Sequence, residues 1–317
     1  MITTIRAFFY YLMLLMYTYM YILFASSTYS VQWTPIHSFY NNMTYYYAHA
    51  FFVILKLVGV KIFTNGKIPT NRMLWISNHR SKFDGLLVLI LLRLNGVNVI
   101  SVVKKSISYL PFFNAFAQHA DLIFIKRAKA DAENVLIEKS RKTLLTNKSI
   151  LIFPEGTTLS PETKAWSDKY AAEHNLKSFQ NVLLPKTAGY EIIQREGKFD
   201  KTGNIIIRYD DPAISGIASH SYIDLLKIFP SSIYIDIKDS NESIRPEDLY
   251  KVFAEKDKEL SQPIVKDNYQ LMNNYSVLCL FLNIISFIIF YYVFFTMPSF
   301  RYATLAFNIA MSIKALF

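Results

Sequence analysis

One short polar stretch places a histidine and an aspartate five positions apart. His79 and Asp84 follow an apolar run, Met73 to Ile76, and precede a second apolar run that starts at Gly85. A neutral imidazole near pH 7 can take a proton from a hydroxyl group, and a fixed carboxylate can hold its tautomer and stabilise the imidazolium that forms. The stretch is therefore a candidate general base with its orienting partner, although a single pair of this kind is not specific.

The spacing of the pair predicts a turn between a strand and a helix. Partners on one helical face lie three or four positions apart, so a spacing of five suits a shared helical face poorly. We expect residues 73–77 to form a strand and His79 to lie in the turn after it. Asp84 is then expected in the first turn of a helix that continues to Leu94.

A second stretch brings a carboxylate, a glycine and two hydroxyl groups to the end of an apolar run. Residues 151–158 are Leu-Ile-Phe-Pro-Glu-Gly-Thr-Thr. Gly156 would let the chain come close to a ligand, and Glu155 could accept hydrogen bonds from substrate hydroxyl groups. Taken alone, the pattern also fits a turn that ends a strand and exposes a glutamate.

Two further apolar runs end in cations. Residues 122–127 end in Lys126 and Arg127, and an arginine in such a position suits bidentate binding of a phosphate. Residues 183–189 place a proline and a lysine after a short apolar run. Singly, the first pattern would be interpreted as a solvated strand edge and the second as a loop.

Charge is concentrated in the middle of this 317-residue chain. All 24 acidic residues lie between positions 64 and 270, whereas the first 63 residues contain three strong charges and the last 47 contain two. The middle therefore has 29 basic and 24 acidic residues, a net charge of +5. A basic centre suits anionic lipid headgroups or a phosphorylated ligand. We expect no nucleic-acid partner, because the sequence has no nucleic-acid-binding signature and no long basic run.

The sequence argues against several other kinds of site. Cys279 is the single cysteine, which excludes an intrachain disulfide and a multi-cysteine zinc site. The chain has no Gly-x-Ser-x-Gly elbow, no phosphate-binding loop ending in Gly-Lys-Ser/Thr and no His-Glu-x-x-His helix. We therefore expect no metal site.

The middle of the chain alternates short β-rich runs with helical stretches. Residues 130–145, for example, place apolar side chains on one helical face and charged side chains on the other. Alternation of this kind predicts an α/β domain. The expected strands are Met73–Ser77, Val97–Val103, Leu122–Lys126, Ile150–Phe153, Asn181–Leu184, Ile205–Arg208 and Ile233–Ile237.

Apolar runs flank this centre. Residues 7–26 and 275–297 carry no charge, and each run is long enough to cross a bilayer as a helix. A cleavable signal peptide is the alternative for the first run. Residues 45–63 are interrupted by one histidine and two lysines, so they either span the bilayer or lie at its interface. Residues 302–313 are shorter, which favours a re-entrant or interfacial piece.

The basic residues near the N-terminus predict an orientation. Arg6 precedes the first apolar run, and residues 27–55 contain no Lys or Arg. The positive-inside rule then places the N-terminus in the cytosol. The charged middle is cytosolic as well, whether the second run crosses back or forms a shallow hairpin with the first. We expect membrane-embedded residues 1–63, a cytosol-facing domain over 64–270 and a membrane anchor over 271–317.

Together, the four polar stretches resemble the conserved blocks of the membrane-bound glycerolipid acyltransferases typified by 1-acyl-glycerol-3-phosphate acyltransferase. Residues 78–84, Asn-His-Arg-Ser-Lys-Phe-Asp, resemble the His-x4-Asp block of that family. Residues 122–127, 153–157 and 184–189 resemble its second block, its Phe-Pro-Glu-Gly-Thr block and its proline-centred fourth block. The resemblance extends over residues 70 to 200.

Further matches resemble the eukaryotic branch that includes lysocardiolipin and lysophosphatidylinositol acyltransferases. They are Asn-His-Arg-Ser at 78–81, Lys104-Lys105-Ser106 with Pro111 and Gln118, Lys164 with Ser167, Ala172-Glu173, and Pro185-Lys186-Thr187 with Gly189. The apolar ends of the chain also agree with this branch.

The resemblance implies a fold and a reaction. The fold is an α/β domain with a central, mostly parallel or mixed sheet, flanked by N-terminal and C-terminal membrane helices. The reaction is transfer of an acyl group from acyl-CoA to the free hydroxyl of a lysophospholipid. By this carry-over His79 is the general base and Asp84 its partner, while Arg127, assisted by Lys126, binds the phosphate.

The resemblance also implies which residues hold the acceptor. Glu155 and Gly156 would form the site for its polyol, and Pro185 would shape the pocket. Thr157 and Lys186 are further substrate-binding positions of the same blocks. No tightly bound cofactor is implied, because acyl-CoA acts as a co-substrate. The expected partners are acyl-CoA, a lysophospholipid and the bilayer, with the endoplasmic reticulum as the expected location and a mitochondrial membrane as the alternative.

The sequence departs from the family pattern at positions that concern binding. Thr158 stands where many bacterial members have Arg, Asp121 where a Gly is usual, Lys186 where this branch has Arg, and Asn114-Ala115 where Gly-Trp is usual. None of these changes removes a proposed catalytic group, but they leave the headgroup open. Two other functions remain as alternatives: a lipid hydrolase that activates water with the same base, and a non-catalytic relative that binds anionic lipid.

Overall fold

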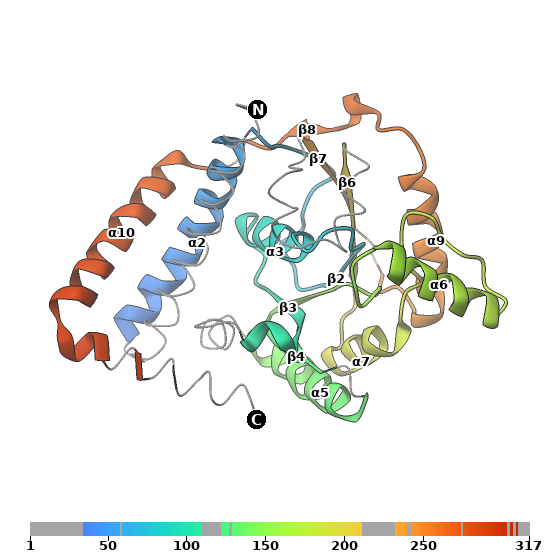
Figure 1. The fold of residues 1–317 in the computed structure, drawn as a ribbon, viewed down its shortest axis with the longest axis horizontal. Coiled ribbons are helices and arrows are strands. Elements are labelled where there is room, and N and C mark those ends of the chain that lie inside the picture. The colour runs from blue at the N-terminus through green and yellow to red at the C-terminus, as the bar shows by residue number, and fades with distance from the viewer. Residues whose placement is uncertain are drawn as a thin grey trace. The chain divides into compact units, whose positions relative to one another are not determined.

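A computed structural model describes residues 34–57, 59–109, 122–126, 129–210, 232–239, 242–273, 275–302, 305–306 and 309 (Figure 1). The chain divides into two compact units. The described residues of the first unit come from 59–101 and 133–273. Those of the second unit come from 34–57, 102–132 and 275–309.

A mixed β-sheet runs through the first unit, with strand order β3-β5-β2-β6-β7-β1-β8. The pairs β3–β5, β5–β2, β2–β6 and β7–β1 are parallel, whereas β6–β7 and β1–β8 are antiparallel. The fold is therefore α/β with a mixed central sheet, as the sequence predicts. The strands are β1 (Lys61–Asn65), β2 (Leu74–Ser77), β3 (Val99–Lys104), β5 (Ser149–Ile152), β6 (Thr202–Tyr209), β7 (Ser232–Asp239) and β8 (Gln270–Leu271).

The two strands at the middle of the parallel region are buried on both faces. Every residue of β2 and of β5 is buried, and both strands consist mainly of aliphatic or aromatic residues. Strands covered on both faces have continuous apolar runs instead of an alternating pattern. This explains why the runs 74–76 and 150–152 could be identified as strands from the sequence.

The register of these strands brings three chain segments to one edge of the sheet. Leu74 of β2 is paired with Ile150 of β5 on one side and with Thr202 of β6 on the other, all in parallel. Parallel neighbours end at the same edge, which is where open α/β sheets commonly place their ligands. The segments that follow β2, β5 and β6 therefore meet there.

The helices of this unit differ in how much of their surface is buried. In α3 the aliphatic residues from Leu87 to Leu92 are all buried, whereas α6 begins with a capping box between Ser160 and Thr163 and has a mostly exposed surface. The helices are α3 (Asp84–Leu94), α5 (Lys129–Thr146), α6 (Pro161–Glu173), α7 (Thr187–Gly197) and α9 (Leu249–Leu260), with short 3-10 turns η3 (Pro246–Asp248) and η4 (Lys266–Asn268).

The second unit contains a pair of helices. Helices α2 (Thr34–Leu57) and α10 (Val277–Thr296) lie side by side (Figure 1). Tyr275 stacks on Phe52 with ring centroids 6.5 Å apart, and the backbone N–H of Ser276 donates to Nδ1 of His49 at 2.9 Å. In this unit the end of β3 pairs in parallel with β4 (Ile123–Ile125), and the 3-10 turn η1 (Lys105–Tyr109) follows β3.

Within the described part of the chain, no helix combines the length and the apolar character that crossing a bilayer requires. The predicted span 7–26 lies outside the described residues, as does much of 302–313. The predicted segment 45–63 falls on α2, which begins earlier, and on β1, to which residues 61–63 belong. The predicted span 275–297 coincides with α10. The flanking membrane helices stay predictions.

One strand prediction is wrong. Residues 181–184 form no strand, because their backbone N–H groups donate to side chains and not to a neighbouring strand. The N–H of Asn181 donates to Asp257 at 2.6 Å, that of Leu183 to Glu155 at 2.9 Å and that of Leu184 to Ser167 at 3.0 Å. The other expected strands are present within one to three residues, and β1 and β8 are additional.

The contact between β2 and β6 yields a test of the packing. Gly203 is paired with the fully buried Trp75, and a Cβ atom at Gly203 would lie 2.3 Å from Cε3 of that indole. We expect Gly203→Ala to destabilise the fold by about 1–3 kcal/mol in a urea denaturation experiment, because overpacking a filled core forces it to shift.

Gly189→Ala is the matched control. In α7 the added methyl group would lie at ordinary contact distances, 3.7 Å from Leu136 and 3.8 Å from Ile152. That change should stabilise the fold by about 0.5–1 kcal/mol through helix propensity. Equal denaturation midpoints for wild type and Gly203→Ala would contradict the packing described.

Candidate active site

The turn after β2 is fastened to β6 by the buried side chain of Asn78. Its Nδ2 donates to the carbonyl of Ile207 at 3.0 Å, and its Oδ1 accepts from the N–H of Ile207 at 2.8 Å. The amide thus continues the pairing of β2 with β6 for one more residue. Because both of its bonds go to backbone, Asn78 fixes where the chain leaves the sheet and therefore where His79 begins.

His79 is held by its backbone and by its ring. Its N–H donates to Oε1 of Glu155 at 2.7 Å, and its carbonyl accepts from the N–H of Leu159 at 2.8 Å. The imidazole packs against the ring of Phe153, with centroids 4.4 Å apart. These contacts come from the segment after β5, which lies beside the His79 turn because the two strands are parallel neighbours.

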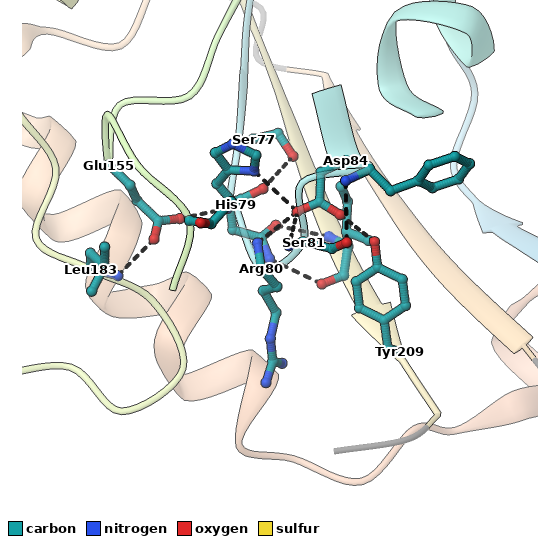
Figure 2. Close-up of polar contacts among 12 residues, drawn as sticks. Ser77, His79, Arg80, Ser81, Asp84, Glu155, Leu183 and Tyr209 are labelled. Atoms are coloured by element: carbon teal, nitrogen blue, oxygen red, sulfur yellow. Dashed lines mark hydrogen bonds and ion pairs between the residues drawn. The ribbon is translucent and has the colours of Figure 1, made fainter. Parts of the chain in front are cut away.

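Asp84 is fully buried at the start of α3 and accepts hydrogen bonds at both oxygens (Figure 2). Oδ2 accepts from the N–H of Arg80 at 2.6 Å, from the N–H of Ser81 at 2.7 Å and from Nδ1 of His79 at 3.3 Å. Oδ1 accepts from the hydroxyl of Tyr209. A buried carboxylate needs this degree of hydrogen bonding, because an unpaired one is strongly disfavoured.

The pair has the geometry of a general base. With Nδ1 donating to a carboxylate, the imidazole proton is on Nδ1, and Nε2 is left with its lone pair. No described residue forms a hydrogen bond with Nε2, and the side chain of His79 is 19% exposed. The imidazole is therefore partly exposed while the carboxylate of Asp84 is fully buried, so an acceptor hydroxyl could reach the ring and water cannot reach the carboxylate.

Glu155, which the family resemblance assigns to the acceptor site, is buried. Its side chain is 1% exposed, and its oxygens accept from the N–H of His79 at 2.7 Å and from the N–H of Leu183 at 2.9 Å. Burial raises the pKa of Glu155 to about 8, against the opposing effect of the two N–H groups and of Lys256. Glu155 thus joins the His79 turn to the segment before α7. Its expected contact with the acceptor stays a prediction.

Lys256 of α9 is a buried lysine whose charge acts on the pKa of Glu155. The side chain is 1% exposed, and Nζ donates to the carbonyl of Ile205 in β6 at 3.0 Å. Burial lowers the pKa of Lys256 to about 7, while Glu155 acts in the opposite direction. A carboxyl group and an amine are therefore both buried in this part of the fold, and each of them is bonded to backbone.

The other expected acceptor residues lie at the surface near this turn. Gly156 is exposed with φ +71°, a conformation that favours glycine, and an added Cβ would lie 3.4 Å from Nζ of Lys186. The N–H of Lys186 donates to the carbonyl of Pro154 at 2.8 Å, which brings the fourth block onto the third. Thr157 and Pro185 are both partly exposed.

The predicted phosphate-binding residues do not belong to the described part of the first unit. Lys126 follows β4 in the second unit and is exposed, and Arg127 lies outside the described residues. Their role stays a prediction. Among the residues that the structure describes, no three His, Cys, Asp or Glu side chains gather as a metal site would require.

Sequence reasoning missed three contributors to the site. The role of Asn78 could have been suspected from its place in the motif, although its partner could not. Tyr209 and Lys256 come from β6 and α9, far along the chain, and neither lies in a motif. A lysine within an amphipathic helix is normally read as solvated, so nothing in the sequence marked Lys256 as buried.

Comparison with known proteins agrees with the family resemblance of the four sequence blocks at 78–84, 122–127, 153–157 and 184–189. Residues 60–192 match the family model described as Acyltransferase. Residues 60–192 therefore match an acyltransferase domain. The match contains His79, Asp84, Glu155 and Lys186, and it ends before β6.

Two curated relatives of the acyltransferase domain act on lysophospholipids according to their names. Lysocardiolipin acyltransferase 1 of Gallus gallus is 32% identical over 49% of this chain and 44% of its own length. The 2-acyl-1-lysophosphatidylinositol acyltransferase of Saccharomyces cerevisiae is 26% identical over 51% of this chain and 53% of its own length. The matched part of this chain thus spans about half the length of these relatives.

A solved structure resembles the fold. The 1-acyl-sn-glycerophosphate acyltransferase PlsC of Thermotoga maritima superposes with a TM-score of 0.50 and 14% identity, over 82% of this chain and 99% of that one. At this identity the likeness concerns the fold of the acyltransferase domain and its surroundings. It agrees with the mixed sheet described above.

The buried glutamate predicts a pH-dependent stability. The folded-state pKa of Glu155, about 8, lies above its ordinary value of 4.5. The folded chain therefore keeps a proton that the unfolded chain loses, so the contribution of Glu155 to stability falls as pH rises through this interval. Glu155→Gln cannot titrate, and its stability relative to wild type should improve from the acidic to the alkaline end. Urea denaturation across this range, with the exposed Glu255→Gln as control, measures the effect.

The burial of Lys256 predicts that its contribution to folding stability changes with pH in the opposite direction, at higher pH. Its folded-state pKa, about 7, lies below the ordinary value of 10.5, so the folded chain loses this proton before the unfolded chain does. Wild type therefore gains stability from this group as pH rises between these values. Lys256→Met lacks the gain, and its stability deficit should grow with pH. The exposed Lys251→Met on the same helix is the control, and a deficit independent of pH would contradict the burial of a titrating amine.

Proposed function

We propose that the chain is an acyl-CoA-dependent lysophospholipid acyltransferase with His79 as its general base. The observation that carries the proposal is the His79–Asp84 pair within an acyltransferase domain, with Nδ1 bonded to the buried carboxylate and the ring partly exposed. The names of the curated relatives support lysophospholipid acceptors.

The proposed reaction is a direct transfer. Nε2 of His79 takes the proton of the acceptor hydroxyl as its oxygen attacks the thioester carbonyl of acyl-CoA. A tetrahedral intermediate forms and collapses, an ester bond replaces the thioester bond, and CoA leaves as a thiolate that receives the proton from the imidazolium. Asp84 stabilises that imidazolium without being consumed. No covalent acyl-enzyme is needed, because a thioester is already activated and its thiolate leaves readily.

The remaining expected residues take part in binding. Arg127 and Lys126 bind the phosphate of the acceptor in this proposal, because an arginine at a strand end suits bidentate capture. Gly156, Thr157, Pro185 and Lys186 form the acceptor side, where the exposed Lys186 amine lies over Gly156. Glu155 positions the backbone of His79 from inside. The acceptor is a membrane lipid, and we place the enzyme at the cytosolic face of a membrane, first of all the endoplasmic reticulum.

The proposed acceptor class is tested by the full-length protein in detergent or nanodiscs. Acyl transfer from acyl-CoA is measured with lysophosphatidate, lysophosphatidylinositol and monolyso-cardiolipin side by side, as release of CoA thiol and as product lipid. Product with at least one acceptor is expected. Fatty acid released without any acceptor would instead indicate a hydrolase. Liposome binding with no turnover on any acceptor would indicate a lipid-binding protein.

The roles of the pair predict large losses of rate. His79→Ala removes the base and Asp84→Asn removes the carboxylate that holds its tautomer, so each should lower kcat by a factor on the order of 10²–10⁴. The exposed His174→Ala, at the end of α6, should leave kcat unchanged. If both site variants keep most of the wild-type rate while they remain folded, the assigned mechanism is wrong.

A further inference from the structure

Strand β6 holds the His79 turn at two points that lie two residues apart. The first is Ile207, whose backbone carries the Asn78 side chain. The second is Tyr209, the last residue of the strand, whose hydroxyl donates to Oδ1 of Asp84. Ile207 contributes its backbone and Tyr209 its side chain, so one short piece of β6 contacts both ends of the turn. Both residues lie after the segment that matches the family model.

The hydrogen bonds divide between the two oxygens of Asp84. Oδ2 serves the turn itself, because the N–H groups of Arg80 and Ser81 and Nδ1 of His79 all donate to it. Oδ1 has Tyr209 as its donor (Figure 2). The phenol is thus the contact that fixes the far oxygen of the carboxylate. Rotation of the carboxylate would cost this bond, so Oδ2 stays directed at the imidazole.

The environment of Tyr209 keeps it in the donor form. Burial, followed by the charge of Asp84, raises the pKa of Tyr209 well above its usual value. The hydroxyl therefore retains its proton throughout the neutral range and donates at any pH at which His79 can act as a base. A side chain that only filled space would not need a hydroxyl group at this point.

We propose that Tyr209 is a positioning residue of the site, which orients Asp84 and through it the imidazole of His79. The inference rests on the proposed acyl transfer for its effect on rate, but its effect on the imidazole is independent of any substrate. Tyr209 is not expected to touch acceptor or acyl-CoA. Its removal should therefore change kcat and leave KM for both substrates nearly unchanged.

The principal experiment compares Tyr209, which is partly buried, with the fully buried Tyr190. Tyr209→Phe should lower kcat on the order of 10- to 100-fold, because a hydrogen bond to a charged group is lost inside the protein. Tyr190→Phe is the matched control. Tyr190 is fully buried, and its hydroxyl bonds to Thr202 at 3.0 Å and to the carbonyl of Ile244 at 2.6 Å. This variant loses a buried hydroxyl of the same kind away from His79, so it should lose stability but keep kcat within about twofold.

A double-mutant cycle separates positioning from a general loss of structure. If Tyr209 acts through Asp84, then Tyr209→Phe should have less than about a twofold effect in an Asp84→Asn background. Multiplicative effects of the two substitutions would overturn the proposal. So would a folded Tyr209→Phe with wild-type kcat, or one that changes KM alone.

A spectroscopic measurement needs no activity. The ¹⁵N shifts of the His79 imidazole, assigned by their absence in His79→Ala, report which ring nitrogen carries the proton. Wild type and Tyr190→Phe should show the Nδ1-protonated form, and Tyr209→Phe should show a mixture of tautomers. Unchanged shifts in Tyr209→Phe would overturn the positioning role. If wild type shows the Nδ1 form but transfers no acyl group, the proposed function fails while the positioning of His79 stands.

A fluorinated tyrosine covers the case in which Tyr209→Phe does not fold. 3-Fluorotyrosine at position 209 keeps the ring and the hydroxyl, and its ¹⁹F shift reports the partner of that hydroxyl. Asp84→Asn should move this shift, and Tyr190→Phe should not. A shift that does not respond to Asp84→Asn would show that the hydroxyl has no bond to that carboxylate, which would contradict the proposal.

Discussion

The whole site depends on how a carboxylate can be kept inside the protein. Asp84 has no exposed surface, and four donors satisfy it: two backbone N–H groups of its own turn, the imidazole of His79 and the phenol of Tyr209. The turn must therefore have the shape that aims two successive N–H groups at one oxygen. This requirement explains the spacing of five residues, which neither a continuous strand nor a continuous helix could satisfy.

The parallel register of β2, β5 and β6 makes this arrangement possible. Each strand end supplies something that the others lack: β2 leads into His79, β5 leads into Phe153 and Glu155, and β6 ends in Tyr209. Glu155 then couples the turn to the segment that leads into α7, because one carboxylate accepts from both chains. These two N–H groups and Lys256 offset only part of the cost of burying its charge, so the pKa of Glu155 stays raised.

The sequence predicted the His79–Asp84 pair and its turn because both residues are local and follow an apolar run that could only be a buried strand. It predicted the α/β class and most of the strands for the same reason. It misjudged residues 181–184, because periodicity cannot tell whether an N–H group will meet a strand or a side chain. It could not predict that Glu155 is buried and bonded to two backbone N–H groups, since a motif specifies a residue type but not the direction of its side chain. The roles of Tyr209 and Lys256 could not be predicted from the sequence, because only the topology of the fold brings β6 and α9 to the turn.

Because β6 contacts the His79 turn, a shortened version of this chain would have to include β6 to keep the site. A fragment that ends at residue 192, where the family match stops, would retain His79, Asp84 and every acceptor residue of the four blocks. It would nevertheless lack β6, which pairs with β2 and supplies both the backbone that receives Asn78 and the phenol that donates to Asp84. Grafting the four blocks onto another scaffold would meet the same difficulty. A module that keeps the site intact would contain β2, β5 and β6 together with α9, whose Lys256 bonds to β6. It would therefore extend at least to residue 260.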